Sequence, residues 1–170
     1  RDGFPIVEIC PTFMIGPNDH YMGTSRLVLA LMKHKLPFVT HGGKCFVYVN
    51  DVATAAVNAL TMGKTGEAYI AGNANLTYEE FAHKVANISG VKPPELVLPT
   101  PLLFTFGRVM GWLGKTFGFT PMLSLGTAKV AADEQYFCSQ KAVTELAMPQ
   151  TDIDEAIRLS CNWLKENGYA

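Results

Sequence analysis

A short loop near the start of the chain, Pro11-Thr-Phe-Met-Ile-Gly-Pro17, combines a hydroxyl group, an aromatic ring and two prolines. It follows residues 6–10, whose apolar and β-branched side chains predict a buried strand that the proline ends. Ligands of open α/β sheets bind beyond the carboxyl ends of the strands. Pro11, Thr12 and Phe13 are therefore the first candidates for contact with a ligand, although a strand end and a turn use the same residue types.

Asp51 is a candidate general base because of its place between a strand and a helix. It directly precedes residues 52–62, an alanine-rich run that predicts the helix. A carboxylate there can also accept hydrogen bonds from the free N–H groups of the first helical turn. We therefore expect Asp51 to cap the helix rather than to transfer protons. Thr24 and Ser25 are expected to cap a helix over residues 26–35 in the same way.

The cysteines and histidines show no spacing typical of a metal site. Cys10, Cys45, Cys138 and Cys161 lie far apart and form no Cys-x-x-Cys pair, and the four histidines are equally scattered. The sequence thus predicts neither a metal centre nor a disulfide framework. We expect free, buried thiols in a reducing cytoplasm.

The order of the predicted elements indicates the fold class. Strands are expected at residues 6–10, 38–40, 45–49, 68–71 and 96–98, and helices at residues 26–35, 52–62, 77–90, 101–117, 139–146 and 152–167. Strands that alternate with helices, followed mostly by helices, favour a parallel α/β sheet with a smaller helical cap. The apolar run at residues 68–71 is expected to be buried on both faces, as parallel strands usually are.

Two helices in this series carry clear start signals. Thr77 and Glu80 form a capping box, and Gly90 ends the helix that they begin. Asp152 and Glu155 are expected to cap the last helix as a similar pair.

Composition limits the partners of the chain. It has 170 residues, of which 48% are hydrophobic, and a net charge of -1, which is typical of an ordinary globular domain. Lysine and arginine never cluster beyond a pair, so nucleic acid is not an expected partner. The chain opens at Arg1 and enters an apolar run at once, so we expect further residues upstream of it.

Three ordered motifs resemble the C-terminal half of extended short-chain dehydrogenases/reductases, the NAD-dependent epimerase/dehydratase superfamily. They are the Pro-Thr-x-x-x-Gly-Pro loop after a strand, Phe46-Val-Tyr-Val-Asn-Asp51-Val-Ala at a helix start, and Tyr69-Ile-Ala-Gly-Asn-x-Asn-Leu-Thr77. Later segments, among them Tyr136-Phe-Cys-Ser-x-Lys141-Ala, are similar to the dihydroflavonol reductase-like branch, which includes hopanoid-associated sugar epimerases. The similarity covers nearly the whole chain.

The resemblance implies a fold and a set of site residues. It implies the C-terminal strands of a Rossmann-type parallel sheet over residues 1–72 and a small, mostly helical substrate-binding cap over residues 73–170. Pro11, Thr12 and Phe13 would lie beside the nicotinamide of NAD or NADP, and Ser25 would approach the cofactor or the substrate.

Lys44 is the expected substrate-binding residue. It stands where sugar-nucleotide members of the superfamily carry an arginine that holds the pyrophosphate. A lysine binds a phosphate as a point charge, without the bidentate fork of arginine. This replacement makes a nucleotide sugar a less favoured substrate.

The acid/base pair of the family is missing from this sequence. That pair is a tyrosine whose pKa is lowered by a lysine four residues later. The residues four positions after the tyrosines that could fill this role are Ser25, Val52, Asn73, Ala82 and Gln140. We therefore expect no catalytic residue in this chain, an upstream Tyr-x-x-x-Lys, and no activity of the chain alone.

Residues 101–117 are more apolar than one helix face requires. The segment has two cations and is too short and too charged to predict a membrane span. Core packing, a lid over an apolar substrate, and a membrane or partner contact are all compatible with it. Gly107, Gly111 and Gly114 mimic a phosphate-binding loop, but they lie inside this helical pattern and instead suggest close helix packing.

The resemblance implies the C-terminal part of an NAD(P)-dependent oxidoreductase that reduces a ketone or aldehyde. A nucleotide-sugar epimerase/dehydratase and a non-catalytic module that senses a dinucleotide are the alternatives. A stand-alone domain is disfavoured, because it would leave a sheet edge uncovered. We expect a cytoplasmic protein that binds a small-molecule substrate and can form a homodimer.

Overall fold

The computed structural model describes residues 4–118 and 125–170, which form short strands and helices in alternation. The strands are β1 (Glu8–Pro11), β2 (Phe13–Ile15), β3 (Phe38–Thr40), β4 (Gly43–Tyr48), β5 (Ala68–Ala71), β6 (Ala74–Thr77), β7 (Leu96–Leu98) and β8 (Glu134–Gln135). The helices are α1 (Ser25–Met32), α2 (Val49–Met62), α3 (Tyr78–Ser89), α4 (Thr100–Phe117), α5 (Leu125–Ala132), α6 (Gln140–Glu145) and α7 (Ile153–Glu166).

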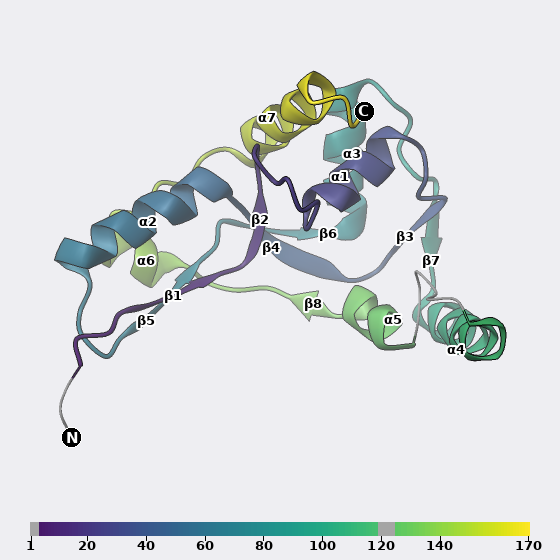
Figure 1. Ribbon diagram of the computed structural model, residues 1–170, viewed down its shortest axis with the longest axis horizontal. Coiled ribbons are helices and arrows are strands. Elements are labelled where there is room, and N and C mark those ends of the chain that lie inside the picture. The colour runs from purple at the N-terminus through teal and green to yellow at the C-terminus, as the bar shows by residue number, and fades with distance from the viewer. Residues whose placement is uncertain (1–3, 119–124) are drawn as a thin grey trace.

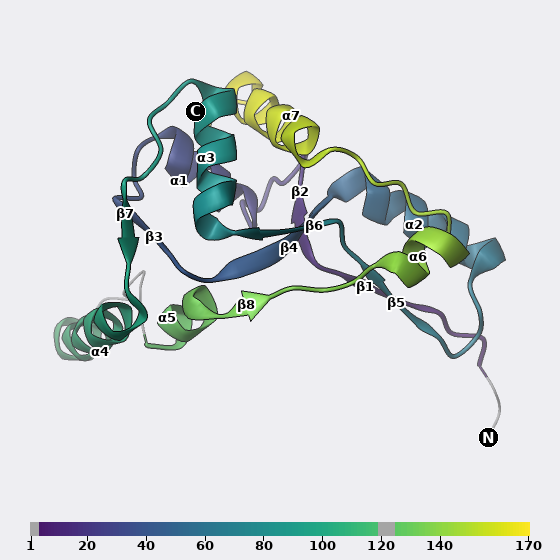
Figure 2. The same cartoon turned by 180° about the vertical axis from the view of Figure 1, so that it is seen from behind.

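The strands form three small sheets. β4 is the centre of the largest sheet, where it pairs in parallel with β2 and β8 and antiparallel with β6. β1 pairs in parallel with β5, and β3 pairs in parallel with β7. The β1–β5 pair and α4 lie at opposite ends of the molecule (Figures 1 and 2). The predicted α/β class is confirmed, and most of the strand pairs are parallel.

Two apolar cores hold these layers together. The first lies where α1, α3 and α7 cover β2 and β4 (Figure 1), and its centre is the stacked ring pair of Phe46 and Phe81, with centroids 4.1 Å apart. The second packs α2 and α6 against β1 and β5 around the buried Tyr69. The first core draws on both predicted segments, residues 1–72 and 73–170, since Phe46 and Phe81 come from different ones.

Local signals explain several helix ends. Thr77 Oγ1 accepts from the backbone N–H of Glu80, and Glu80 Oε2 accepts from the backbone N–H of Thr77 at 2.8 Å, so the predicted capping box is confirmed. Gly90 ends α3 in the left-handed conformation, at φ 76°. Pro101 stands in the first turn of α4, as predicted.

The predicted capping role of Asp51 is wrong. α2 begins at Val49, three residues before the predicted start at residue 52, so Asp51 lies inside its first turn. The buried Asp51 carboxylate instead accepts from the backbone N–H and the hydroxyl of Thr151, both at 2.8 Å. It therefore joins the start of α2 to the segment that leads into α7.

The caps of α1 and α7 also differ from the prediction. Neither Thr24 nor Ser25 caps α1 with its side chain; the Asp19 carboxylate accepts from the N–H groups of Ser25 at 2.9 Å and Gly23 at 3.0 Å. Burial acts to raise the pKa of Asp19, but these hydrogen bonds outweigh it and hold the pKa below its ordinary value. Asp152 caps α7 as predicted, whereas Glu155 pairs with Arg158 instead.

Two expectations about burial are corrected as well. Tyr69 and Ala71 of β5 are buried while Ala68 and Ile70 are exposed, so β5 is covered on one face only. The four cysteines are free, but only Cys45 and Cys161 are buried, whereas Cys10 is half-buried and Cys138 is exposed. Burial raises the pKa of the Cys161 thiol to about 11, which keeps it protonated at neutral pH.

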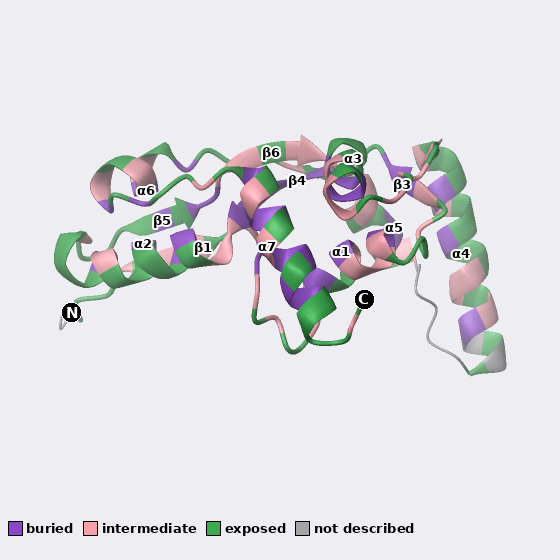
Figure 3. Ribbon diagram, turned by 90° about the horizontal axis from the view of Figure 1, so that it is seen from above, coloured by how far each residue is buried: buried purple, intermediate pink, exposed green. Residues whose placement is uncertain are grey.

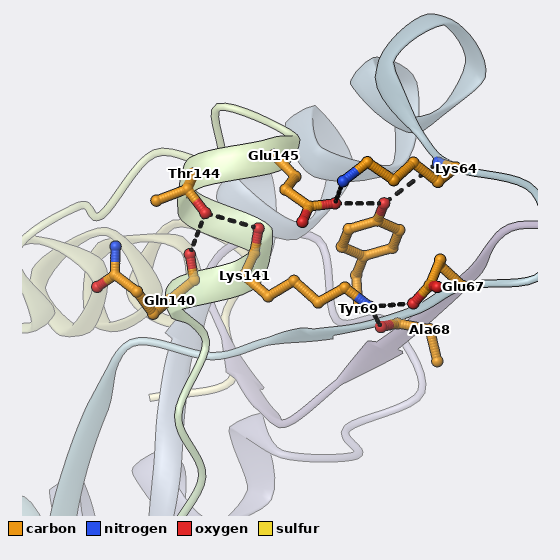
Figure 4. Close-up of polar contacts among 8 residues, drawn as sticks. All are labelled: Lys64, Glu67, Ala68, Tyr69, Gln140, Lys141, Thr144 and Glu145. Atoms are coloured by element: carbon orange, nitrogen blue, oxygen red, sulfur yellow. Dashed lines mark hydrogen bonds and ion pairs between the residues drawn. The ribbon is translucent and has the colours of Figure 1, made fainter.

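A polar cluster fastens α6 to β5 (Figure 4). The Tyr69 hydroxyl donates to Glu145 Oε2 at 3.0 Å and accepts from the backbone N–H of Lys64 at 3.2 Å. Lys141 Nζ donates to Glu67 and to the carbonyl of Ala68, and lies 4.5 Å from the centroid of the Tyr69 ring. The cluster sets the path of the chain between β8 and α6, on which one wall of the site depends.

Candidate functional site

A cavity of about 480 Å³ opens beside the carboxyl end of β1, next to β4 and β8. Its wall is mostly apolar and carries a few polar groups, as small-molecule sites usually do. It is lined by Cys10, Pro11, Thr12, Phe13, Lys44, Cys45, Ile70, Tyr78, Val130, Gln135 and Phe137.

Thr12 is held in this cavity wall by the end of β5. Its backbone N–H donates to the carbonyl of Ala71 at 3.0 Å, and its hydroxyl donates to the same oxygen at 3.2 Å. The neighbouring Gly72 allows the close approach, because a Cβ there would lie 2.6 Å from Cys45 Sγ and 3.1 Å from the Thr12 side chain. The hydroxyl of Thr12 keeps free lone pairs with which to accept a hydrogen bond.

Lys44 supplies the cationic group of the cavity. The residue is only 7% exposed, and its Nζ donates to Oε1 of Gln135 at 2.5 Å, across the β4–β8 pair. Burial lowers the pKa of Lys44, while the charge of Asp133 acts in the opposite direction. An ammonium that carries three donors and contacts a neutral amide can still bind an oxygen atom of a ligand.

Phe13 and Tyr78 also line a second cavity of about 460 Å³, so the two cavities adjoin. Its lining is almost entirely apolar and comes from α1, β3, α3, α4 and α5, with Leu31, Val39, Leu103 and Met110 among the contributors. Burial raises the pKa of Tyr78 to about 12. The Tyr78 hydroxyl therefore stays protonated at neutral pH and can donate a hydrogen bond.

The structure brings together four of the five predicted site residues. Pro11, Thr12, Phe13 and Lys44 all line the first cavity, whereas Ser25 lines neither cavity. Ser25 is buried at the start of α1, and its Oγ has no hydrogen-bond partner among the described residues.

Sequence reasoning missed Tyr78 and Gln135. Tyr78 was interpreted only as the second residue of a capping box, and Gln135 lies in a strand of two residues that no local pattern predicts. Tyr78 directly follows the end of β6 (Ala74–Thr77), a strand that the sequence did not predict, so no local signal pointed to this residue.

The expected absences concern metals and a phosphate-binding loop. Within residues 4–118 and 125–170, no group of His, Cys, Asp and Glu side chains could hold a metal ion. Gly107, Gly111 and Gly114 lie inside α4 and not at a strand-to-helix turn, as expected. A Cβ on Gly111 would meet no described atom within 4 Å, so close packing does not explain that glycine.

No helix of the described part has the length and hydropathy needed to cross a membrane.

Known proteins resemble the chain over half of their own length. No family model matches it. A curated protein of Synechocystis sp., named "Putative dihydroflavonol 4-reductase", is 29% identical over 174 residues, which cover 99% of this chain and 51% of that protein. The solved structure of gox2253 is 29% identical and aligns with a TM-score of 0.79 over 96% of this chain and 50% of its own. A nucleoside-diphosphate-sugar epimerase from Pseudomonas aeruginosa is 22% identical, with a TM-score of 0.76 over 99% of this chain and 50% of its own.

Two further structures with the same fold contain a dinucleotide. RMD from Pseudomonas aeruginosa, complexed with NADPH, aligns with a TM-score of 0.65 at 12% identity, over 98% of this chain and 50% of its own. UDP-glucuronic acid 4-epimerase from Bacillus cereus, in complex with UDP-glucuronic acid and NAD, aligns with a TM-score of 0.65 at 16% identity, over 96% of this chain and 46% of its own. The chain therefore spans about half the length of the relatives that it matches.

Proposed function

Since the chain belongs to the extended short-chain dehydrogenase/reductase family, we propose that it is the C-terminal part of an NAD(P)-dependent oxidoreductase that reduces a ketone or aldehyde. In this proposal the chain contributes the loop beside the nicotinamide and much of the substrate pocket. The observation that carries it is the cavity in which Thr12, between β1 and β2, and Phe13 of β2 meet the buried cation of Lys44.

The residues of the cavity suit a nicotinamide. NAD(P)H, when bound, supplies the hydride. Thr12 Oγ1 donates to Ala71 and can accept from the carboxamide N–H, while Phe13 and Ile70 give an apolar wall that excludes water. The acid/base pair is assigned to residues upstream of this chain, and Pro11 and Ser25 remain predicted cofactor contacts.

Lys44 and Tyr78 are the donors that could orient a substrate oxygen. Both line the first cavity, and the Tyr78 phenol, whose pKa burial raises to about 12, is protonated at neutral pH as a phenol of ordinary pKa also is. A carbonyl held by such donors is polarised toward hydride attack. Lys44 is the one cationic residue in the described lining of this cavity. A single positive charge is too little to neutralise a diphosphate. This favours a simple carbonyl compound over a nucleotide sugar.

The test needs a protein that contains this chain together with the upstream residues. We expect its reading frame to encode a glycine-rich loop and a Tyr-x-x-x-Lys pair, and the protein to oxidise NADH or NADPH when given a ketone or aldehyde. Thr12→Val should raise KM for the cofactor about tenfold, the effect of one hydrogen bond. Lys44→Met should raise KM for the carbonyl substrate, while the exposed control Lys92→Met should leave both constants unchanged.

The alternatives give different results in the same assay. A nucleotide-sugar epimerase would interconvert UDP-sugars without net consumption of NADH, and a sensing module would bind the dinucleotide without turnover. A reading frame that begins near Arg1 would contradict the oxidoreductase proposal. The division at residues 72 and 73, the cytoplasmic location and the homodimer stay predictions.

A further inference from the structure

One side of α4 presents an apolar surface that no described part of the chain covers. Leu102 is 58% exposed, Phe106 46%, Val109 51% and Trp112 65%, and their spacing of four, three and three residues places them along one side of the helix. The other side packs inward through the buried Leu103, against α5 and the apolar cavity. Figure 3 shows α4 at one end of the molecule with exposed residues along its length. We call Leu102, Phe106, Val109 and Trp112 the α4 stripe.

The stretch of sequence that contains the stripe has basic residues but no acidic ones. Three of the chain's 14 basic residues and none of its 15 acidic residues fall between Glu95 and Asp133, so the rest of the chain carries a net charge of −4. Arg108 is exposed and lies one helical turn before Trp112. The overall charge of −1 is thus the sum of a basic segment and an acidic remainder.

We propose that the α4 stripe docks on the surface of an anionic lipid membrane, with α4 lying in the plane of the headgroups. Exposed apolar side chains beside basic ones, with a tryptophan among them, are the features that hold a helix in this interface. Each cation near an anionic surface adds to the attraction. Phe106 also lines the apolar cavity, so docking would bring that cavity close to the lipid.

A second copy of the chain is a poorer occupant of the stripe. Two α4 helices that met through their stripes would bring the Arg108 side chains of both copies toward each other, and α4 has no acidic residue to pair with them. An anionic bilayer can bury the apolar side chains among its acyl chains and attract the basic side chains to its headgroups. The argument from charge therefore selects the lipid surface.

Vesicle flotation of the 170-residue chain tests the proposal. The vesicles are phosphatidylcholine alone, or phosphatidylcholine with about one quarter phosphatidylglycerol. We expect about tenfold stronger binding to the anionic vesicles and about a tenfold loss when salt is raised to about 0.5 M. Brominated lipids should quench the tryptophan fluorescence of the chain. This quenching reports on Trp112, because the second tryptophan, Trp163, is buried between His20 and Tyr169.

Two matched double variants locate the contact. Leu102→Ser with Val109→Ser should reduce vesicle binding about tenfold or more, because it removes two exposed apolar side chains from the stripe. Val57→Ser with Leu60→Ser changes the same residue types on the exposed side of α2, where they are 65% and 84% exposed, and should bind like the original chain. Thermal unfolding checks that both variants keep the fold.

Several outcomes would overturn the proposal. These are equal binding to both vesicle types, no binding to either, or full binding by the α4 double variant. A concentration-dependent dimer that the α4 variant abolishes would assign the stripe to a second copy instead. Binding by the chain but not by a longer protein that contains the upstream residues would show that those residues cover the stripe.

Discussion

Asp51 shows how a buried carboxylate can serve the fold rather than the chemistry. Both of its oxygens accept hydrogen bonds from Thr151, 100 positions away in the sequence. Asp51→Ala should therefore lower the free energy of unfolding by about 1–3 kcal/mol, since it leaves the half-buried donors of Thr151 unpaired. Urea unfolding measures this loss. Thr151→Val removes only the hydroxyl donor and should cost about 1 kcal/mol; a variant of Asp51 that kept its stability would refute this structural role.

Lys44 behaves in the opposite way, because its burial opposes folding. Its pKa in the folded protein lies below the ordinary value of 10.5, so the folded state binds the proton less tightly than the unfolded chain. The destabilisation is complete at neutral pH and disappears as the pH rises through the folded pKa toward 10.5. Lys44→Met should thus raise the free energy of unfolding by roughly 1 kcal/mol at pH 7 and by less near pH 10.

Urea unfolding at the two pH values checks this prediction for Lys44. The exposed Lys92→Met is the control and should leave stability unchanged at both. A Lys44→Met variant that is strongly destabilised at pH 7 would mean that the ammonium holds the fold together, and its assignment to substrate binding would lose support.

At the scale of elements, the docking of α6 on β5 depends on the Tyr69 hydroxyl. It lies between Glu145 of α6 and the backbone of Lys64 (Figure 4). Tyr69→Phe keeps the buried ring and removes both hydrogen bonds, which should cost about 1–2 kcal/mol. Hydrogen exchange should then speed up in α6 more than in α3. Lys141→Met removes the exposed ion pair with Glu67, the hydrogen bond to the Ala68 carbonyl and the contact with the Tyr69 ring, and should cost about 1 kcal/mol or less because the ammonium is exposed.

At the scale of the whole molecule, the β1–β5 pair has two open edges. β1 pairs only with β5 among the described strands, and Ile6 and Ile70 beside this pair are exposed. Open edges of apolar strands attract further strands. The Rossmann-type strands that we propose upstream would cover the edge of β1.

Hydrogen exchange measures whether that edge is covered in a longer protein. The amide of Ile9, which alternates along β1 with the amides of Glu8 and Thr12 that donate to the β5 side, should exchange about tenfold more slowly, or slower still, in a protein with the upstream residues than in this chain alone. Amides of α7, which packs in the other core, are the internal control. Equal exchange of β1 in both proteins would mean that the upstream residues pair elsewhere.

The sequence by itself determined the elements whose signals are local. The capping box at Thr77 and Glu80, the proline at the start of α4 and the glycine after α3 act within one helical turn, so they work before any tertiary contact forms. The position of Pro11, Thr12 and Phe13 at a cavity was also predicted, because residues that follow a strand lie at the edge of its sheet. The predicted loop itself is wrong at Phe13–Ile15, which form β2 and pair with β4.

Only the tertiary structure decided the features that depend on a distant partner. β8 exists because Gln135 pairs with Lys44, 91 positions earlier, and two residues carry no periodicity of their own. Asp51 is of a residue type that often caps helices, yet its carboxylate accepts its hydrogen bonds from Thr151. The exposed stripe on α4 is equally invisible in the sequence, because an apolar helix shows its uncovered side only after its neighbours are placed. The energies of strand pairing and burial come from contacts between residues far apart in the sequence, and local sequence patterns do not predict those contacts.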